Sequence, residues 1–225
     1  MEKQPTRVQQ SEEAAVRVIS GSAKGRPLKA VPGTGTRPTT DKVKEALFSM
    51  IGPYFDGGEA LDLFAGSGGL GIEALSRGMD KAVFIDIDKK SVDTIRDNVQ
   101  AAKVEERTEI FRSEAAKALR ALAKRSKAFD LVFLDPPYRM KDIPDYLAYM
   151  EENGLVRDGA TIVVEHEASF EYPEEICSFR LRRRAQYGDT AVSLYVFRPG
   201  PSGQHMVQED EVGQKAAAEQ EMERK

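Results

Sequence analysis

The sequence predicts an α/β protein whose central sheet is mostly parallel and is covered by helices on both faces. The first observation is a regular alternation of apolar strands and amphipathic helices between residues 60 and 165. The second is a glycine-rich turn between the first of these strands and its helix. The third is an apolar strand that runs directly into a proline-rich bend. Strand–helix units of this length give parallel strands because each helix returns the chain to the start of the next strand.

The expected elements follow from hydrophobic periodicity and from residues that end helices. Strands are predicted at 60–65, 81–86, 108–111, 129–134 and 161–165. Helices are predicted at 70–77, around 92–99, at 115–124 and around 143–152. Two more strands, 179–185 and 192–197, flank Gly188-Asp189 and indicate an antiparallel hairpin at the sheet edge. Before the sheet, 17–21 and 27–31 predict a small β-hairpin, and 41–51 an amphipathic helix.

This order divides the chain into four parts. They are a disordered polar tail at 1–14, a hairpin and helix at 15–52, the main domain at 53–198 and a polar, acidic tail at 199–225. The 225 residues are 40% hydrophobic and 31% charged, a composition typical of a soluble globular protein.

Neither a membrane span nor a secretory signal is expected. No apolar run approaches the ~20 residues that a membrane helix needs, and the N-terminus has no apolar core. A cytoplasmic protein without a membrane partner is therefore expected. It is also expected to be a monomer. Cys177 cannot form an internal disulfide and is expected to be at least half-buried. With only two histidines beside it, no metal site is expected.

The net charge of −4 conceals two basic segments. Residues 17–46 carry seven Lys and Arg residues against two acidic residues, a local net charge of +5, and 180–184 carry four arginines. A phosphate backbone responds to local charge and not to the total. Lys24, Arg26 and Arg37, which flank a loop rich in Gly and Thr, are therefore candidate phosphate contacts.

The glycine-rich turn predicts a nucleotide-type cofactor site. Gly66, Gly68 and Gly71 fit G-x-G-x-x-G, and Asp86 stands twenty residues after Gly66, where a carboxylate can accept hydrogen bonds from ribose hydroxyls. The motif fits NAD and S-adenosylmethionine equally. Asp62 at the strand end favours a cationic ammonium group over a pyrophosphate. The predicted cofactor contacts here are Asp62, Phe64, Ala65, Gly66, Ser67, Gly68, Gly71, Asp86 and Ile87.

The fourth strand runs into Asp135-Pro136-Pro137-Tyr138, which predicts the catalytic bend. Two prolines fix φ and remove two N–H donors, so the bend offers acceptors only. An exocyclic base amine is a poor nucleophile because its lone pair is delocalised into the ring. Asp135 and the Pro136 carbonyl can each accept a hydrogen bond from one of the two amine hydrogens. These hydrogen bonds localise the lone pair on nitrogen and stabilise the positive charge that develops when a methyl group arrives.

The same bend carries an aromatic side chain, Tyr138, which is expected to stack on the target base. Such a base must be flipped out or already unpaired. Transfer is then an in-line displacement at a sulfonium methyl group that depends mainly on alignment. This interpretation decides between the two cofactors in favour of S-adenosylmethionine.

These residues resemble a known family. Asp-Pro-Pro-Tyr after the fourth strand looks like the motif of the amino-methyltransferases that modify exocyclic nitrogens of adenine, cytosine or guanine. Residues 17–28 and 36–48 resemble the RsmD family of 16S rRNA guanine-N2 methyltransferases, and the match extends through 187–190 to residue 197. The resemblance implies a Rossmann-like methyltransferase fold, a seven-stranded sheet, an N-terminal hairpin that holds RNA, and a substrate that is an assembled or nearly assembled small ribosomal subunit.

By matching positions, the resemblance implies that Asp86 binds the ribose, the glycine turn the methionine part, and residues 135–138 the target amine. The sequence departs from the pattern after the third strand, where many methyltransferases have an acidic residue. Arg112-Ser113-Glu114 stands there, so Ser113 and Glu114 are the candidates for the adenine contact.

Three alternatives remain open. A DNA adenine-N6 methyltransferase also suits Asp-Pro-Pro-Tyr, but such enzymes usually need a larger target-recognition region than this short arm. A non-catalytic RNA-binding ribosome assembly factor explains the basic segments but not the intact bend. An NAD-dependent oxidoreductase has no candidate acid or base beyond His166.

Overall fold

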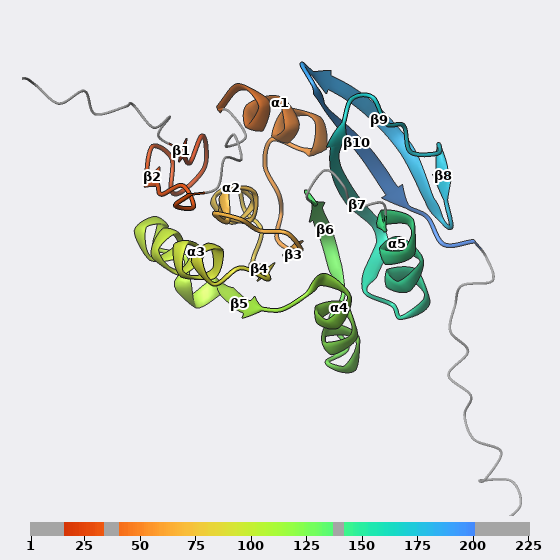
Figure 1. Cartoon of the computed structure of the whole chain (residues 1–225), viewed down its shortest axis with the longest axis horizontal. Coiled ribbons are helices and arrows are strands. Elements are labelled where there is room, and N and C mark those ends of the chain that lie inside the picture. Colours follow the sequence, from red (N-terminus) through yellow and green to blue (C-terminus); the bar gives the residue numbers. More distant parts are fainter. Residues whose placement is uncertain (1–15, 34–40, 137–141, 201–225) are drawn as a thin grey trace, which may run out of the picture.

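The structure, a computed structural model, describes residues 16–33, 41–136 and 142–200. Its main feature is an eight-stranded sheet in the order β5-β4-β3-β6-β7-β10-β9-β8 (Figure 1). The strands are β3 (Glu59–Asp62), β4 (Lys81–Asp86), β5 (Thr108–Arg112), β6 (Phe129–Leu134), β7 (Val156–Glu167), β8 (Glu175–Ile176), β9 (Phe179–Tyr187) and β10 (Thr190–Phe197). The five strands from β5 to β7 are parallel, and the remaining three continue the sheet in antiparallel pairs.

Helices cover both faces of the sheet, as expected for parallel strands (Figure 1). The helices are α1 (Asp41–Ile51), α2 (Gly69–Ser76), α3 (Lys89–Ala102), α4 (Ala115–Lys124) and α5 (Ile143–Glu152), with a short 3-10 turn at Glu105–Arg107. Along β3, Ala60 packs in the apolar core beneath α1, α2 and α3. Its neighbour Leu61 packs in the core beneath α4 and α5. The alternation of a β-strand thus assigns each side chain to one of two cores.

The predicted fold class is confirmed, and the boundaries of α1, α4, α5, β4 and β6 coincide with the predicted ones. The prediction of seven strands omits β8, because two residues are too few to show a period. Strand β7 begins five residues before the predicted start, since Arg157, Asp158 and Gly159 interrupt the apolar pattern. Strand β3 is shorter than predicted. Residues 63–65 keep hydrogen bonds to β6 and β4 but already belong to the turn.

The N-terminal arm (residues 16–33) contains the predicted hairpin, with β1 (Val16–Arg17) paired to β2 (Pro27–Leu28). Both strands are shorter than predicted. The arm packs on α2 and α3, and Val16, Val18 and Leu28 belong to the same core as the sheet. Gly21 makes the closest approach: it has φ 83°, and a Cβ there would lie 1.7 Å from the carbonyl oxygen of Ser76. Only glycine fits this contact between the arm and α2.

Cys177 does not have the predicted burial: its side chain is exposed. It follows the two-residue strand β8 in a turn with φ 51°, at the outer edge of the sheet. No described helix is both long enough and apolar enough to span a membrane.

Candidate active site

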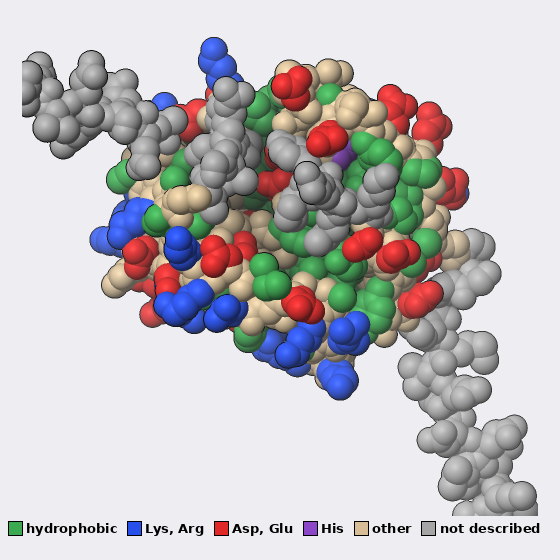
Figure 2. Space-filling model, in the orientation of Figure 1, with side chains coloured by type: hydrophobic (Ala, Val, Ile, Leu, Met, Phe, Trp, Pro, Cys, Tyr) green, Lys and Arg blue, Asp and Glu red, His purple; other side chains and the backbone are tan. Residues whose placement is uncertain are grey.

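Four acidic residues meet at the carboxyl edge of the parallel strands. Asp62 ends β3 and Asp86 ends β4, while Asp135 directly follows β6 and Glu165 lies near the end of β7. The strand alternation places all four on the face covered by α1, α2 and α3, because each lies two residues after a member of that core: Ala60, Phe84, Phe133 and Val163. Figure 2 shows acidic side chains inside the hollow at the centre of this surface. Ligands of open α/β sheets bind at this edge.

The glycine turn between β3 and α2 has an open side that a ligand can approach. Gly66 and Gly68 have φ values of 54° and 78°, a backbone region that favours glycine. A Cβ at Gly66 would meet no described atom within 4 Å, whereas one at Gly71 would lie 2.4 Å from the Phe84 ring. The first two glycines therefore shape the turn, and the third lets α2 pack closely on β4.

Asp86 holds the turn in place. One carboxylate oxygen accepts the Gly66 N–H at 2.8 Å, and the other accepts the Asp88 N–H at 2.8 Å. A carboxylate has about four acceptor positions, so Asp86 retains capacity for two ribose hydroxyls. These contacts fit the predicted role in binding a ribose at the end of β4.

Several other predicted cofactor contacts lie near Asp86 or near the end of β3. Ile87 is 60% exposed and offers an apolar side chain to a planar ring. The Ser113 N–H donates to the Asp86 carbonyl at 3.0 Å, and Glu114 is exposed at the N-cap of α4. On the other side of the turn, the half-buried Phe64 ring lies 6.2 Å from the ring of Tyr146. Ile87 and Ser113 are thus direct neighbours of Asp86, and Phe64 lies two residues after the end of β3.

Asp62 lies deeper, behind the turn. It is 2% exposed and accepts the Gly71 N–H at 3.2 Å. Burial raises the pKa of Asp62 to about 7, and the nearby charges of Asp135 and Asp86 add to the shift. A cationic group bound in front of the turn would reverse this shift, because an opposite charge stabilises the ionised form. The structure thus fits the predicted meeting of Asp62 with an ammonium group.

Asp135 occupies the tip of β6, beside Asp62. Its side chain keeps part of its surface accessible, yet burial raises the pKa of Asp135 to about 6. Pro136 follows it and is buried. Pro137 and Tyr138, the other half of the predicted catalytic bend, lie outside the described residues. The described half of the bend therefore lies next to the glycine turn, which is the arrangement that the sequence predicts.

The predicted phosphate contacts differ in their surroundings. Lys24 is exposed at the tip of the arm's hairpin. Arg26 is half-buried and donates to the carbonyl oxygen of Ala101 at 2.8 Å, at the C-terminal end of α3. Arg37 lies outside the described residues. Lys24 is thus open to solvent, whereas part of the Arg26 guanidinium already has a partner within the protein.

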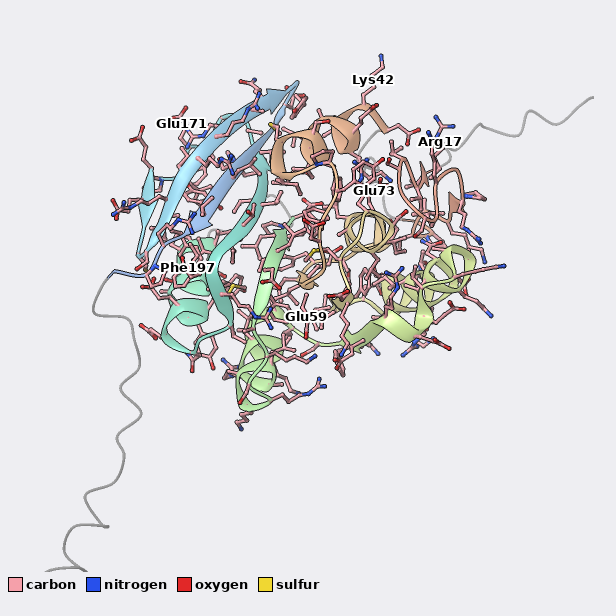
Figure 3. All side chains as sticks on the ribbon, turned by 180° about the vertical axis from the view of Figure 1, so that it is seen from behind. Arg17, Lys42, Glu59, Glu73, Glu171 and Phe197 are labelled. Carbon is pink, nitrogen blue, oxygen red and sulfur yellow. The ribbon has the colours of Figure 1, made fainter. Side chains whose placement is uncertain are left out.

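Sequence reasoning missed the residues that fix the arm to α2 and to the glycine turn. Glu73 on α2 is fully buried, and Figure 3 shows it between α1, α2 and the arm. Its carboxylate accepts the N–H groups of Ile19 and Ser20 at 2.8 and 2.9 Å. It also forms ion pairs with Arg77 at 2.8 Å and with Lys44 at 3.4 Å. The one signal in the sequence was an acidic residue inside an otherwise apolar helix.

Asn98 on α3 makes the second connection. Its amide accepts the Lys29 N–H at 2.7 Å and donates to the Lys29 carbonyl at 2.9 Å. The same amide nitrogen donates to the Ser67 carbonyl at 2.8 Å. Ser67 belongs to the glycine turn, so one buried side chain joins the arm to the predicted cofactor site.

The contacts of His166 indicate a structural role for this side chain. Its Nε2 lies 2.9 Å from the Ser193 hydroxyl and its Nδ1 lies 2.9 Å from the Glu167 carbonyl oxygen, so both ring nitrogens have partners. Its ring also packs edge-on against Tyr172 at 5.2 Å. Within the described parts of the chain, no group of His, Cys, Asp and Glu side chains is arranged to hold a metal ion.

Comparison with known proteins agrees with this architecture. The model of the family described as "Conserved hypothetical protein 95" matches residues 16–196. "Putative rRNA methyltransferase YlbH" of Bacillus subtilis is 49% identical over 180 residues, 80% of this chain and 98% of that protein. "Ribosomal RNA small subunit methyltransferase D" of Escherichia coli is 34% identical over 180 residues, 80% and 89% of the two chains. A solved RNA methyltransferase of Salinibacter ruber in complex with S-adenosyl-L-homocysteine has a TM-score of 0.56 at 17% identity, over 73% and 95% of the chains.

With this strand order, the chain has the fold of known methyltransferases. Within that class, the chain belongs to the Conserved hypothetical protein 95 family, the RsmD family that the sequence resembles.

Proposed function

We propose that this protein transfers a methyl group from S-adenosylmethionine to the exocyclic N2 of a guanine in 16S rRNA. The observation that carries the proposal is the position of Asp135 at the tip of β6, beside Asp62 and the glycine turn. The names of the relatives support rRNA as the substrate class. We further propose that the protein acts as a monomer in the cytoplasm on the small subunit or an assembly intermediate.

Different residues around the turn bind different parts of the cofactor. S-adenosylmethionine supplies a methyl group on a positively charged sulfur. Asp86 accepts hydrogen bonds from the ribose, and Ile87, Ser113 and Glu114 border the adenine. The turn residues Phe64 to Gly68 face the methionine part, and Asp62 stabilises its ammonium group. This division leaves the space between the turn and Asp135 for the target base.

At the tip of β6, Asp135 and the Pro136 carbonyl each accept a hydrogen bond from one hydrogen of the target amine. These contacts concentrate the lone pair on nitrogen and orient it for in-line attack. They also stabilise the positive charge that builds on nitrogen, because carboxylate and carbonyl acceptors bind a charged N–H more strongly than a neutral one. Pro137 keeps the bend rigid, and Tyr138 stacks on the base. In this proposal Asp135 then accepts the proton that the nitrogen loses.

Mass mapping of modified nucleotides tests this function directly. In cells without the gene, one N2-methylguanosine is expected to disappear from 16S rRNA. The gene for the unaltered protein should restore it. Loss of a methylated adenine from DNA, or no change in 16S rRNA, would contradict the proposal.

The arm is proposed to hold RNA through Lys24, Arg26 and Arg37. Their joint replacement by glutamine should weaken RNA binding and lower the slope of log Kd against log salt by about 2, since each phosphate contact releases less than one counterion. The matched control is Lys117→Gln, an exposed cation on α4, which covers the opposite face of the sheet from the arm. If the triple variant keeps the slope of the unaltered protein, the arm does not contact phosphates.

A further inference from the structure

Glu165 is an acidic residue of the site that the proposed reaction leaves without a role. In the β6–β7 ladder the last pair is Leu134 with Val164. One residue further on, Asp135 and Glu165 stand on adjacent parallel strands. Both follow residues of the α4–α5 core, so both side chains belong to the opposite face, above the core that contains Phe133 and Val163. The register therefore places the two carboxyl groups side by side.

The carboxylate of Glu165 has unused hydrogen-bonding capacity. No hydrogen bond or ion pair joins it to any residue in the described ranges 16–33, 41–136 and 142–200. On β10 the residue opposite is Val192, which offers only an apolar side chain. Burial and the charge of Asp135 raise the pKa of Glu165 to about 8. Glu73 in the same fold shows the contrast, since cations and N–H groups surround its carboxylate.

Among the described residues no cation pairs with Glu165, and an acid held beside another acid in this way destabilises the folded state, which is typical of a functional site. The hydrogen-bonding groups of guanine explain why two carboxyl groups would stand side by side here. Next to its N2 amine the ring carries N1–H, a second donor. In adenine and cytosine, the ring nitrogen beside the amine is an acceptor. A flipped base is read by hydrogen bonds to this edge, and two adjacent acceptors match guanine alone.

We propose that Glu165 determines the base specificity of the reaction: its carboxylate accepts the N1–H of the target guanine while Asp135 accepts a hydrogen of the N2 amine. This inference rests on the proposed function. In the free protein the two neighbouring carboxyl groups retain a proton. The N1–H donor stabilises ionised Glu165, and the proton leaves to solvent when guanine enters. Above the pKa of Glu165, about 8, the carboxylate is ionised, and a base with a bare ring nitrogen beside its amine places a lone pair against it. Below that pH the protonated carboxyl group can donate to the bare nitrogen, so the preference for guanine is greatest above about pH 8.

The test compares guanine with 2-aminopurine, which keeps the 2-amine but has no hydrogen on N1. Small subunits are reconstituted with 16S rRNA that carries either base at the position found by mass mapping. At a pH above the Glu165 pKa of about 8, the unaltered protein should methylate guanine with a kcat/KM about 30-fold higher or more, since a hydrogen bond to a charged group has this effect. The Glu165→Gln variant should lose most of that preference, because an amide can donate to the bare nitrogen.

Two controls separate the outcomes. Glu167→Gln changes an exposed acid two residues along the same strand and should keep the preference. If Glu165→Gln does not fold, Glu165→Asp retracts the carboxylate by one methylene and should lower kcat/KM for guanine only. Equal methylation of both bases by the unaltered protein, or an unchanged preference in the folded variants, overturns the role of Glu165 but leaves the methyl transfer intact. No methylation of guanine overturns the proposed function itself.

Discussion

Replacement of Asp135 by alanine is expected to slow methyl transfer by about a thousandfold or more, because the loss of one preorganised polar contact to developing charge has about this effect. Cofactor affinity should stay within about threefold, since Asp86 and the glycine turn, which form the proposed cofactor contacts, are unchanged. The protein should be no less stable than the unaltered one. Burial raises the pKa of Asp135 to about 6, so its ionised form is disfavoured in the fold. Single-turnover rates and calorimetric titration with S-adenosylmethionine measure the two effects.

The matched variant Asp135→Asn keeps an acceptor oxygen and removes the charge, so its rate should lie between those of the alanine variant and the unaltered protein. The rate of the unaltered protein should fall as the pH drops through about 6, because protonated Asp135 loses acceptor capacity. Loss of cofactor binding in the alanine variant would contradict the assigned role and place Asp135 in the cofactor pocket.

The sequence could predict those parts of the site that are formed by one short segment of the chain. The turn with Gly66 and Gly68 and the bend at Asp135 each lie in a short segment where residue type determines backbone shape. Strands such as β4 and β6 have enough buried residues to show their pattern. These features place the glycine turn and the bend at Asp135 at one edge once the strands are recognised as parallel.

The parts that could not be predicted depend on pairing between distant segments. Asp135 and Glu165 are neighbours only because Leu134 pairs with Val164, and a shift of one residue would turn Glu165 to the other face. The partners of Glu73 come from the arm, α1 and α2, and those of Asn98 from the arm and the turn. A single sequence shows such residues as polar positions in a helix and does not identify their partners.

These contacts change the interpretation of the arm. Residues 15–52 were predicted to form a separate part of the chain, but the described arm shares its core with the sheet. Glu73 and Asn98 hold its backbone against α2 and the glycine turn. If the arm binds RNA as proposed, that RNA has a fixed position relative to the glycine turn.

Replacement of Glu73 by alanine should lower the free energy of unfolding by about 3–5 kcal/mol, the usual effect of removing one partner of a buried ion pair. The variant leaves Lys44 and Arg77 buried without their carboxylate, and two N–H groups of the arm without an acceptor. Burial lowers the pKa of Lys44, and Glu73 opposes that shift. Without Glu73, Lys44 therefore deprotonates more readily, which moderates the loss at high pH. Urea unfolding followed by circular dichroism measures the change.

Two variants show whether the effect comes from this cluster. Glu45→Ala removes an exposed acid from α1 and should change stability by no more than about 0.5 kcal/mol. Lys44→Met removes one cation and leaves Glu73 with its other three donors, so its effect should be smaller than that of Glu73→Ala. A loss below about 1 kcal/mol for Glu73→Ala would mean that water replaces the carboxylate. The arm would then be held by its apolar contacts and by its hydrogen bonds to Asn98 and Ser76, and its position beside the glycine turn would not depend on Glu73.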